Sequence, residues 1–269
     1  MKSNLFIIGA PKCGTTSLAS SLFKSSDCFV PKIKEPNFWG QNEINNISIN
    51  KYQKIYQKGI KKKHLVDAST SYFSNPKAIS QIYRYNPKAL IIIILRDPIE
   101  RAFSHWKMEK YQYLRESNDF KTAFYLNGSH FNYFNQKINP YREVSKYHTH
   151  INVVYNTFSK NQILITSITD PNLLQKISEF LNIKIHPIEK LNSSYSSINP
   201  TLQKLINSNY LDFLRKLIPI DKKDNIKIFF YKKTKPILIK NYLSESELME
   251  MKGFFSQDYE FLKKYQVHI

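Results

Sequence analysis

A short stretch near the start of the chain combines the residue types that hold a phosphate-like anion. Gly9-Ala-Pro-Lys-Cys-Gly-Thr-Thr-Ser17 follows the apolar run Leu5–Ile8, and apolar residues at helical spacing come after it. The pattern predicts a buried strand, a glycine-bounded loop and the beginning of a helix. Amides of such a turn and the helix dipole favour negative charge, and Lys12 adds a full positive charge. We therefore expect an anion site here.

The loop departs at one position from the nucleotide-binding pattern G-x-x-x-x-G-K-[ST]. Gly9 and Gly14 have the right separation, but Thr15 stands where that pattern has its lysine. A metal-dependent NTPase also needs an acidic metal ligand at the end of another strand. The nearest candidate, Asp97, precedes a proline and is better interpreted as a helix cap. We expect a phosphate-like ligand held without an obligatory metal. A strand-helix turn that binds nothing is the alternative.

A second cation follows another apolar stretch. Ala89–Leu95 is almost uninterrupted and is typical of a strand buried on both faces. It leads into Arg96, at the carboxyl end of that strand, where open α/β sheets bind their ligands. Ser104 lies about two turns into the helix predicted to follow. Because arginine is a fork-shaped donor, a second phosphate-like group is predicted here, with a simple ion pair as the alternative.

Cys13, inside the anion loop, raises the possibility of a thiolate nucleophile. The Cys-x5-Arg spacing of phosphatase sites would need an arginine at position 19, which is alanine. Cys13 is therefore interpreted as a bystander thiol. The chain has two cysteines, Cys13 and Cys28, which build no disulfide framework.

The elements that position these residues alternate between strands and helices. Strands are predicted at Leu5–Ile8, from His64, at Ala89–Leu95 and at Gln162–Ile168, and helices from Thr15, around Tyr52–Tyr56, from Asn75 to about Tyr85, after Asp97, over Tyr141–Phe158, at Pro171–Leu181 and from the capping box Ser244–Glu247. This order predicts an α/β fold with a P-loop-NTPase-like central parallel sheet flanked by helices, in one domain over residues 1–269. Residues 186–240 predict no clear element.

Composition permits several anionic partners without selecting one. The 269 residues carry a formal charge of +19 and are 42% hydrophobic, so the chain can bury a core. Such a charge suits a nucleotide-type cofactor, an acidic glycan, nucleic acid or a membrane surface, although coding bias towards Lys, Asn and Ile produces it too. No apolar run approaches transmembrane length, and the first residues are too short for a signal peptide. A cytoplasmic protein without a membrane span is expected.

Four stretches, in order, resemble those of the sulfotransferases that use 3′-phosphoadenylyl sulfate (PAPS). They are Gly9–Ser17, Lys34–Trp39, Val66–Pro76 and Leu95–Ser104. In that family the corresponding segments are the 5′-phosphosulfate loop, the segment with the catalytic glutamate, the substrate-side loop and the 3′-phosphate motif. The likeness is strongest to the carbohydrate branch, which includes heparan-sulfate O-sulfotransferases and bacterial relatives. It runs from residue 4 to about 106 and continues faintly beyond.

The resemblance implies a role for each matching residue. The 5′-phosphosulfate would be held by Lys12, Cys13, Gly14, Thr15, Thr16 and Ser17, and the 3′-phosphate by Arg96 and Ser104. Glu35 would be the general base that accepts the proton of the acceptor hydroxyl, and Lys12 would stabilise charge on the leaving group. The acceptor side would be lined by Lys34, Phe38, Trp39, Tyr72 and Phe73. PAPS would be the donor, adenosine 3′,5′-bisphosphate (PAP) the product, and no metal, nucleic acid or membrane is implied.

The chain also departs from the family pattern. Heparan-type members often have a lysine after the acidic residue that matches Asp67, and here that position is Ala68. Extracellular members have a late disulfide hairpin, whereas this chain has no cysteine beyond Cys28. These departures favour a cytoplasmic, bacterial-type enzyme with a hydroxyl-bearing acceptor, expected to be a carbohydrate. A P-loop kinase and a non-catalytic nucleotide- or glycan-binding protein of the same fold remain the alternatives. The sequence does not give the acceptor or the oligomeric state.

Overall fold

The computed structural model describes residues 2–33, 35–42, 44, 46–113, 115–127, 138–185, 187, 238–267 and 269. Residues 188–237, which include most of the segment without predicted elements, lie outside this part. The chain groups into two compact units. The first consists of Met1–Arg101, Val144–Leu191 and Phe255–Ile269, and the second of Ala102–Glu143 and Asn192–Phe254. The expectation of one domain over residues 1–269 stays a prediction.

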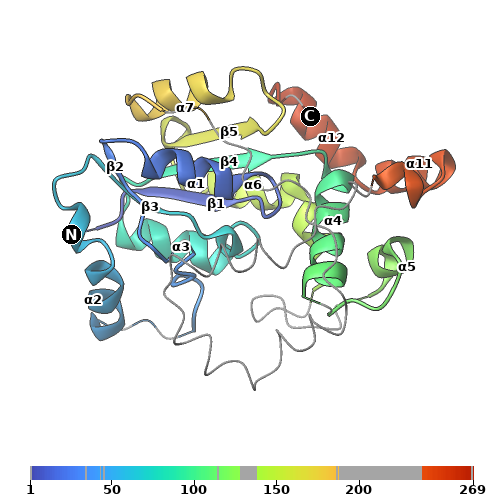
Figure 1. Ribbon diagram of the computed structural model, residues 1–269, viewed down its shortest axis with the longest axis horizontal. Helices are drawn as coiled ribbons and strands as arrows, with labels where there is room; N and C mark the ends of the chain where they lie inside the picture. Colours follow the sequence, from blue (N-terminus) through green and yellow to red (C-terminus); the bar gives the residue numbers. More distant parts are fainter. Residues whose placement is uncertain are drawn as a thin grey trace, which may run out of the picture. The chain divides into compact units, whose positions relative to one another are not determined.

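The first unit is built on a parallel sheet (Figure 1). In the described part of the chain this sheet has five strands: β1 (Leu5–Gly9), β2 (Cys28–Phe29), β3 (His64–Asp67), β4 (Leu90–Leu95) and β5 (Ile163–Ser167). Their order is β2-β3-β1-β4-β5, and every neighbouring pair is parallel. β1 and β4 are adjacent and almost completely buried, as their continuous apolar runs predict. Because all strands point the same way, the loops that follow them meet at one edge of the sheet.

Helices flank this sheet, which confirms the predicted α/β class. Those of the first unit are α1 (Thr15–Phe23), α2 (Asn46–Lys54), α3 (Pro76–Tyr85), α6 (Tyr147–Tyr155), α7 (Leu173–Leu181) and α12 (Ser256–Lys264), and α4 (Pro98–Lys107) begins in it. α3 begins as the sequence indicates: Asn75 caps it by accepting a hydrogen bond from the Ala78 amide at 3.2 Å, and Pro76 occupies the first turn.

Two predicted helices have different bounds in the structure. The helix expected over Tyr141–Phe158 is a 3-10 turn at Glu143–Ser145 followed by α6. Lys146, between them, has a non-helical ψ of 72°, and the Ser145 hydroxyl is held by Arg101 and the Pro98 carbonyl. The single terminal helix expected from Ser244 is two helices, since Phe255 has a non-helical backbone (φ −102°, ψ 20°) that interrupts it.

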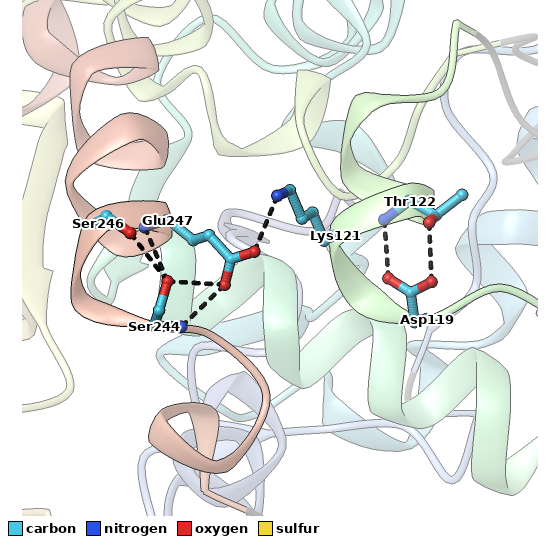
Figure 2. Close-up of polar contacts among 6 residues, drawn as sticks. All are labelled: Asp119, Lys121, Thr122, Ser244, Ser246 and Glu247. Atoms are coloured by element: carbon cyan, nitrogen blue, oxygen red, sulfur yellow. Dashed lines mark hydrogen bonds and ion pairs between the residues drawn. The ribbon is translucent and has the colours of Figure 1, made fainter.

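The second unit contains the rest of α4, the π-helical turn Met108–Gln112, α5 (Phe120–Tyr125) and α11 (Glu245–Phe254). Figure 2 shows the polar contacts at the beginnings of α5 and α11. Asp119 caps α5 through the Thr122 amide at 2.9 Å. Ser244 and Glu247 form the predicted capping box, and Glu247 also pairs with Lys121 at 2.8 Å. This ion pair links α5 to α11. In the described parts of the chain, no helix is both long and apolar enough to span a bilayer.

Candidate active site

The loop after β1 has the sharp curvature of an anion-binding turn. Lys12 has a φ of 72° and Gly14 a φ of 83°, both in the left-handed region. A side chain at Gly14 would be strained by that φ, and its Cβ would lie 2.5 Å from Cδ1 of Ile168. The Ala10 amide donates to the Ile94 carbonyl at 2.7 Å, which fixes the loop against the end of β4. The sequence Gly-Ala-Pro-Lys-Cys-Gly therefore produces a turn that only glycine at position 14 permits without strain.

This turn presents several donors together. Gly14 is the N-cap of α1 and has no side chain to satisfy the first amides of the helix. Lys12, Thr16 and Ser17 are half-buried, and Thr15 is buried. The positive end of the helix dipole lies at the same place. A half-buried lysine, hydroxyl groups and a helix N-terminus without a side-chain cap together suit a phosphate or sulfate group.

Cys13 belongs to the core rather than to this donor set. Its side chain is fully buried, and burial raises the pKa of its thiol to about 11, with Arg101, Arg96 and Lys12 opposing the shift. The thiol stays protonated at neutral pH, so it is not a nucleophile. The Cys13 amide donates to the Ala10 carbonyl at 3.2 Å. The structure therefore supports the bystander interpretation, and Cys13 offers a cofactor neither its side chain nor an unengaged amide.

Arg96 lies at the carboxyl end of β4, where the sequence predicts it. Its backbone is fixed because its carbonyl accepts a hydrogen bond from the Tyr147 hydroxyl at 3.0 Å. Its guanidinium is about one-third exposed and pairs with Glu100 at 3.0 Å. The next residue, Asp97, is the expected helix cap: one oxygen accepts from the Ile99 and Glu100 amides, both at 2.9 Å. The other oxygen accepts from the Tyr259 hydroxyl of α12 at 2.7 Å.

Lys12 and Arg96 belong to the same edge of the sheet. They follow β1 and β4, which are adjacent parallel strands. Both lower the pKa of the Cys13 thiol, so both charges lie within electrostatic reach of that one buried sulfur. Ser104, the third predicted phosphate ligand, is half-buried on the part of α4 that belongs to the second unit. The structure thus brings the two predicted cations to one edge.

Glu35 lies beside the segment that follows β3, the neighbour of β1 on the other side. Its carboxylate oxygens are 3.4 and 3.5 Å from Oγ1 of Thr70, in the 3-10 turn Thr70–Tyr72. Glu35 is half-buried, so the carboxylate is both positioned and accessible. Along the sheet edge the order is therefore Glu35, the Lys12 loop and Arg96. Lys34, a predicted acceptor-side residue, lies outside the described residues.

The predicted aromatic lining is mostly core. Trp39 is 5% exposed, Tyr72 0% and Phe73 1%, so these rings pack inside the chain. Phe73 lies against the backbone of Gly9, where an added Cβ would come within 2.6 Å of the Phe73 Cβ. Phe38 alone of the four predicted aromatics is half-buried. The acceptor-side role of these aromatic residues stays a prediction, and burial leaves Trp39, Tyr72 and Phe73 little surface to offer an acceptor.

A buried carboxylate, Asp67, is the feature of this region to which sequence reasoning gave no role. It ends β3 and is 0% exposed. Hydroxyl groups of Ser69, Tyr52 and Tyr72 donate to it at 2.6, 2.7 and 3.1 Å. Burial raises its pKa to about 6. Among the described residues, no group of three or more His, Cys, Asp or Glu side chains is placed to hold a metal ion.

A comparison with protein families gives a match over most of the chain. The family model described as "Sulfotransferase domain" matches residues 2–234. Two curated relatives are both named bifunctional heparan sulfate N-deacetylase/N-sulfotransferase 1. The one from Caenorhabditis briggsae is 32% identical over 128 residues, which is 43% of this chain and 14% of that protein. The one from Caenorhabditis elegans is 35% identical over 109 residues, which is 38% of this chain and 12% of that protein.

Two solved structures share the fold. A sulfotransferase from Alicyclobacillus acidocaldarius superimposes with a TM-score of 0.59 and 23% identity, covering 77% of this chain and 90% of its own. Mouse sulfotransferase SULT7A1 complexed with PAP gives a TM-score of 0.51 and 16% identity, covering 99% of this chain and 89% of its own. At these identities the likeness shows the fold alone.

Proposed function

The chain belongs to the sulfotransferase family and is a sulfotransferase, and from that premise we propose its donor, base and acceptor. The donor is PAPS, the product is PAP, and the acceptor is a hydroxyl group of a carbohydrate or glycoconjugate. Glu35 accepts the hydroxyl proton as general base, and Lys12 stabilises the leaving group.

The proposal for the donor depends on one observation: Lys12 and Arg96 follow two adjacent parallel strands. PAPS carries a phosphosulfate at one end of its ribose and a 3′-phosphate at the other, so it needs two cationic sites on one edge. The residues present fit that need, since Lys12 lies in a curved loop at a helix N-terminus and Arg96 offers a partly exposed guanidinium. PAP in the mouse neighbour is a property of that protein and is consistent with this donor.

Lys12 would act on the leaving group. When bound, PAPS supplies the sulfuryl group and a phosphate leaving group. A cation that faces the oxygen on which charge develops stabilises the transition state more than the ground state. Lys12 and the first turn of α1 are the donors of this loop, with Thr15, Thr16 and Ser17 adding hydroxyl groups. We assign the 5′ end to this loop, and the 3′-phosphate to Arg96 with Ser104.

Glu35 is proposed as the base because its carboxylate is accessible and lies on the same sheet edge. Its contacts to Thr70 are 3.4 and 3.5 Å, so the carboxylate lies beside the turn that follows β3. General base catalysis contributes about 10²–10⁴-fold. Phe38, beside Glu35 in sequence and half-buried, is the aromatic surface available to an acceptor.

A carbohydrate acceptor is supported by the names of the two relatives and by the charge of the chain. Both relatives are named for heparan sulfate, an acidic glycan, but this chain spans only 14% and 12% of their lengths. The formal charge of +19 would attract such an anionic polymer. An N-acetylated glycan tests whether hydroxyl groups accept the sulfuryl group, because its amino groups are blocked and cannot accept it.

Two measurements test the proposal. In thermal unfolding, PAP at about 100 times its dissociation constant should stabilise the chain by roughly 2.7 kcal/mol, whereas 5′-AMP, without the 3′-phosphate, should give a much smaller shift. No shift with PAP would remove the donor assignment. In the second, radiolabelled PAPS is incubated with an N-acetylated, unsulfated heparan-type glycan and, separately, with a phenol. Label in the phenol but not in the glycan would exclude the proposed acceptor class.

A further inference from the structure

Asp67 is a buried carboxylate whose described partners are hydroxyl groups. Ser69, Tyr52 and Tyr72 donate to it at 2.6, 2.7 and 3.1 Å, and in the described part of the chain no basic side chain forms an ion pair with it. A buried carboxylate without a cation is costly. A buried charge at such a place suggests a task other than holding the fold together.

The direction of the hydrogen bonds indicates that Asp67 orients the hydroxyl groups around it. An ionised carboxylate only accepts, so Ser69 and Tyr72 must point their single hydroxyl protons at Asp67. Their oxygens are then free to accept from the other side. The Ser69 oxygen accepts the Asn37 amide at 3.0 Å, and the Tyr72 oxygen accepts the Phe38 amide at 2.9 Å and the Trp39 amide at 3.4 Å.

These three amides belong to the segment that begins with Glu35. Asn37 has a φ of 48°, a left-handed conformation that turns the chain between Glu35 and Phe38. The Ser71 hydroxyl donates to the Asn37 side chain at 2.6 Å. The same 3-10 turn thus contacts Glu35 through Thr70, Asn37 through Ser71 and Phe38 through Tyr72.

We propose that Asp67 is a positioning residue for the transfer reaction: by orienting the hydroxyl groups of Ser69 and Tyr72, it holds residues 37–39 and so sets the place of the Glu35 carboxylate. Only the expected effect of Asp67 on turnover rests on the proposed function. The fixing of residues 37–39 stands on the hydrogen bonds alone. The substitution that tests it is Asp67→Asn, which keeps the shape but places an amide donor against one of the two hydroxyl groups. That hydroxyl oxygen must then accept a hydrogen bond from the Asn side chain. Its own proton turns towards the backbone N–H that it accepted before, and that hydrogen bond is lost.

Because Asp67 titrates, the hydrogen bonds that hold residues 37–39 should depend on pH. Burial raises the pKa of Asp67 from 3.8 to about 6, and the three hydroxyl groups oppose the shift while Glu35 adds to it. The titratable groups that face Asp67 are Glu35, Tyr52, Tyr56, Tyr72 and Tyr85, and burial raises the pKa of all four tyrosines. The four tyrosine hydroxyl groups therefore stay neutral near pH 6. Protonation of Asp67 below about pH 6 should therefore loosen residues 37–39 in the wild type but not change the Asn variant.

The sign of the stability change separates this role from a purely structural one. Because the folded pKa lies above the unfolded one, ionisation of Asp67 opposes folding most strongly above about pH 6, and this penalty shrinks as the pH falls from about 6 towards 3.8. Asp67→Asn should then melt no lower than the wild type at about pH 7.5. A carboxylate whose loss costs turnover but not stability is positioned for function.

The first test is hydrogen exchange of individual amides. In Asp67→Asn, the amides of Asn37, Phe38 and Trp39 should exchange about fivefold to tenfold faster, the factor expected for one net hydrogen bond, while those of β1 and β4 keep their protection. Asp119→Asn, at the cap of α5, is the matched control and should leave residues 37–39 unchanged. Unchanged exchange in Asp67→Asn would overturn the proposal, whatever the protein catalyses.

The second test is kinetic. Asp67→Asn should lower kcat about tenfold while the KM for PAPS and the melting shift with PAP stay within about twofold, since the cofactor residues lie elsewhere. Tyr72→Phe should give a similar loss, and the double variant should lose no more than either alone. Additive losses, or equal losses in PAP binding and turnover, would overturn the proposal in favour of general structural damage. A wild type that shows no PAP shift contradicts the proposed function alone, because the exchange measurement is independent of it.

Discussion

The guanidinium Nη2 of Arg96 lies 3.0 Å from Oε2 of Glu100, one helical turn further along the chain. The proposed 3′-phosphate ligand therefore has an internal carboxylate partner in the first turn of α4, the helix that follows it. A phosphate that binds Arg96 has to compete with this carboxylate. The pair is partly exposed, so the competition is weak and depends on salt.

Glu100→Gln should therefore raise the affinity for PAP. Exposed ion pairs contribute about 0–1 kcal/mol, which corresponds to a gain of at most about fivefold. Calorimetric titration with PAP at low and high salt measures the effect, and the gain should shrink as salt increases. Glu179→Gln, on α7, is the control for removing one negative charge elsewhere. Equal affinity of the wild type and Glu100→Gln at low salt would show that Arg96 does not contact the phosphate.

Lys12→Asn isolates the charge of Lys12 from its conformation. Lys12 has a φ of 72°, and Asn tolerates this left-handed region better than most residues do. The loop should keep its shape and the chain its melting temperature, whereas kcat with PAPS should fall by roughly 10²–10³, the size of effect seen when a donor to a developing anion is removed. Steady-state kinetics and unfolding of the same preparation check both parts. A variant with full turnover would exclude Lys12 from the leaving-group role.

Glu35→Gln removes the proposed base but keeps a similar shape. PAP should still raise the melting temperature as in the wild type, because the residues proposed to hold it are unchanged. Turnover should fall by about 10²–10⁴, the usual contribution of a general base. Glu143→Gln, in the second unit, is a matched carboxylate control. If Glu35→Gln transfers sulfuryl groups at the wild-type rate, the base is another residue.

Both cysteine thiols should be unreactive in the folded chain. Burial raises the pKa of Cys13 and of Cys28 to about 11, so neither forms an appreciable thiolate at neutral pH. Iodoacetamide at about pH 7.5 should label neither thiol in the native protein and both in denaturant. Mass spectrometry of the intact chain counts the labels. Rapid native labelling of Cys13 would show that the loop opens far more often than its burial suggests.

Gly14→Ala should destabilise the anion loop for two separable reasons. A left-handed φ costs a non-glycine residue about 1–2 kcal/mol, and the new Cβ would lie 2.5 Å from Cδ1 of Ile168. Ile168→Ala removes the second cause only, so the double variant should recover part of the lost stability. Denaturant unfolding of the four proteins forms the cycle. If the double variant recovered all of the stability lost in Gly14→Ala, the left-handed φ at position 14 would cost alanine nothing.

The parts of the fold that could be predicted from the sequence are those encoded locally. The apolar runs of β1 and β4 specify buried parallel strands, and the residues directly after each run lie at its carboxyl end. For that reason the positions of Lys12 and Arg96 after the ends of these two strands are predictable from the sequence. Asp97 was likewise a predictable cap, since the proline after it fixes the first turn of α4.

Features that depend on distant partners could not be predicted. Asp67 is surrounded by hydroxyl groups that come from α2 and from the turn after β3, and nothing near Asp67 in sequence indicates Tyr52. Trp39 and Phe73 are aromatic in a way that fits either a sugar-binding face or a core, and only their burial decides between the two. The break between α11 and α12 lies at Phe255, and no glycine or proline at that position announces it in the sequence.

The C-terminal helix α12 has a consequence for how the chain is made. Asp258 accepts the His148 amide at 2.8 Å, and Tyr259 donates to Asp97 at the beginning of α4 at 2.7 Å. A ribosome synthesises the five strands of the described sheet long before these two residues emerge, so these contacts of the first unit form only after α12 has been translated. The family match stops at residue 234, yet a polypeptide shortened to that boundary would lack α12, which belongs to the same compact unit as Lys12 and Arg96.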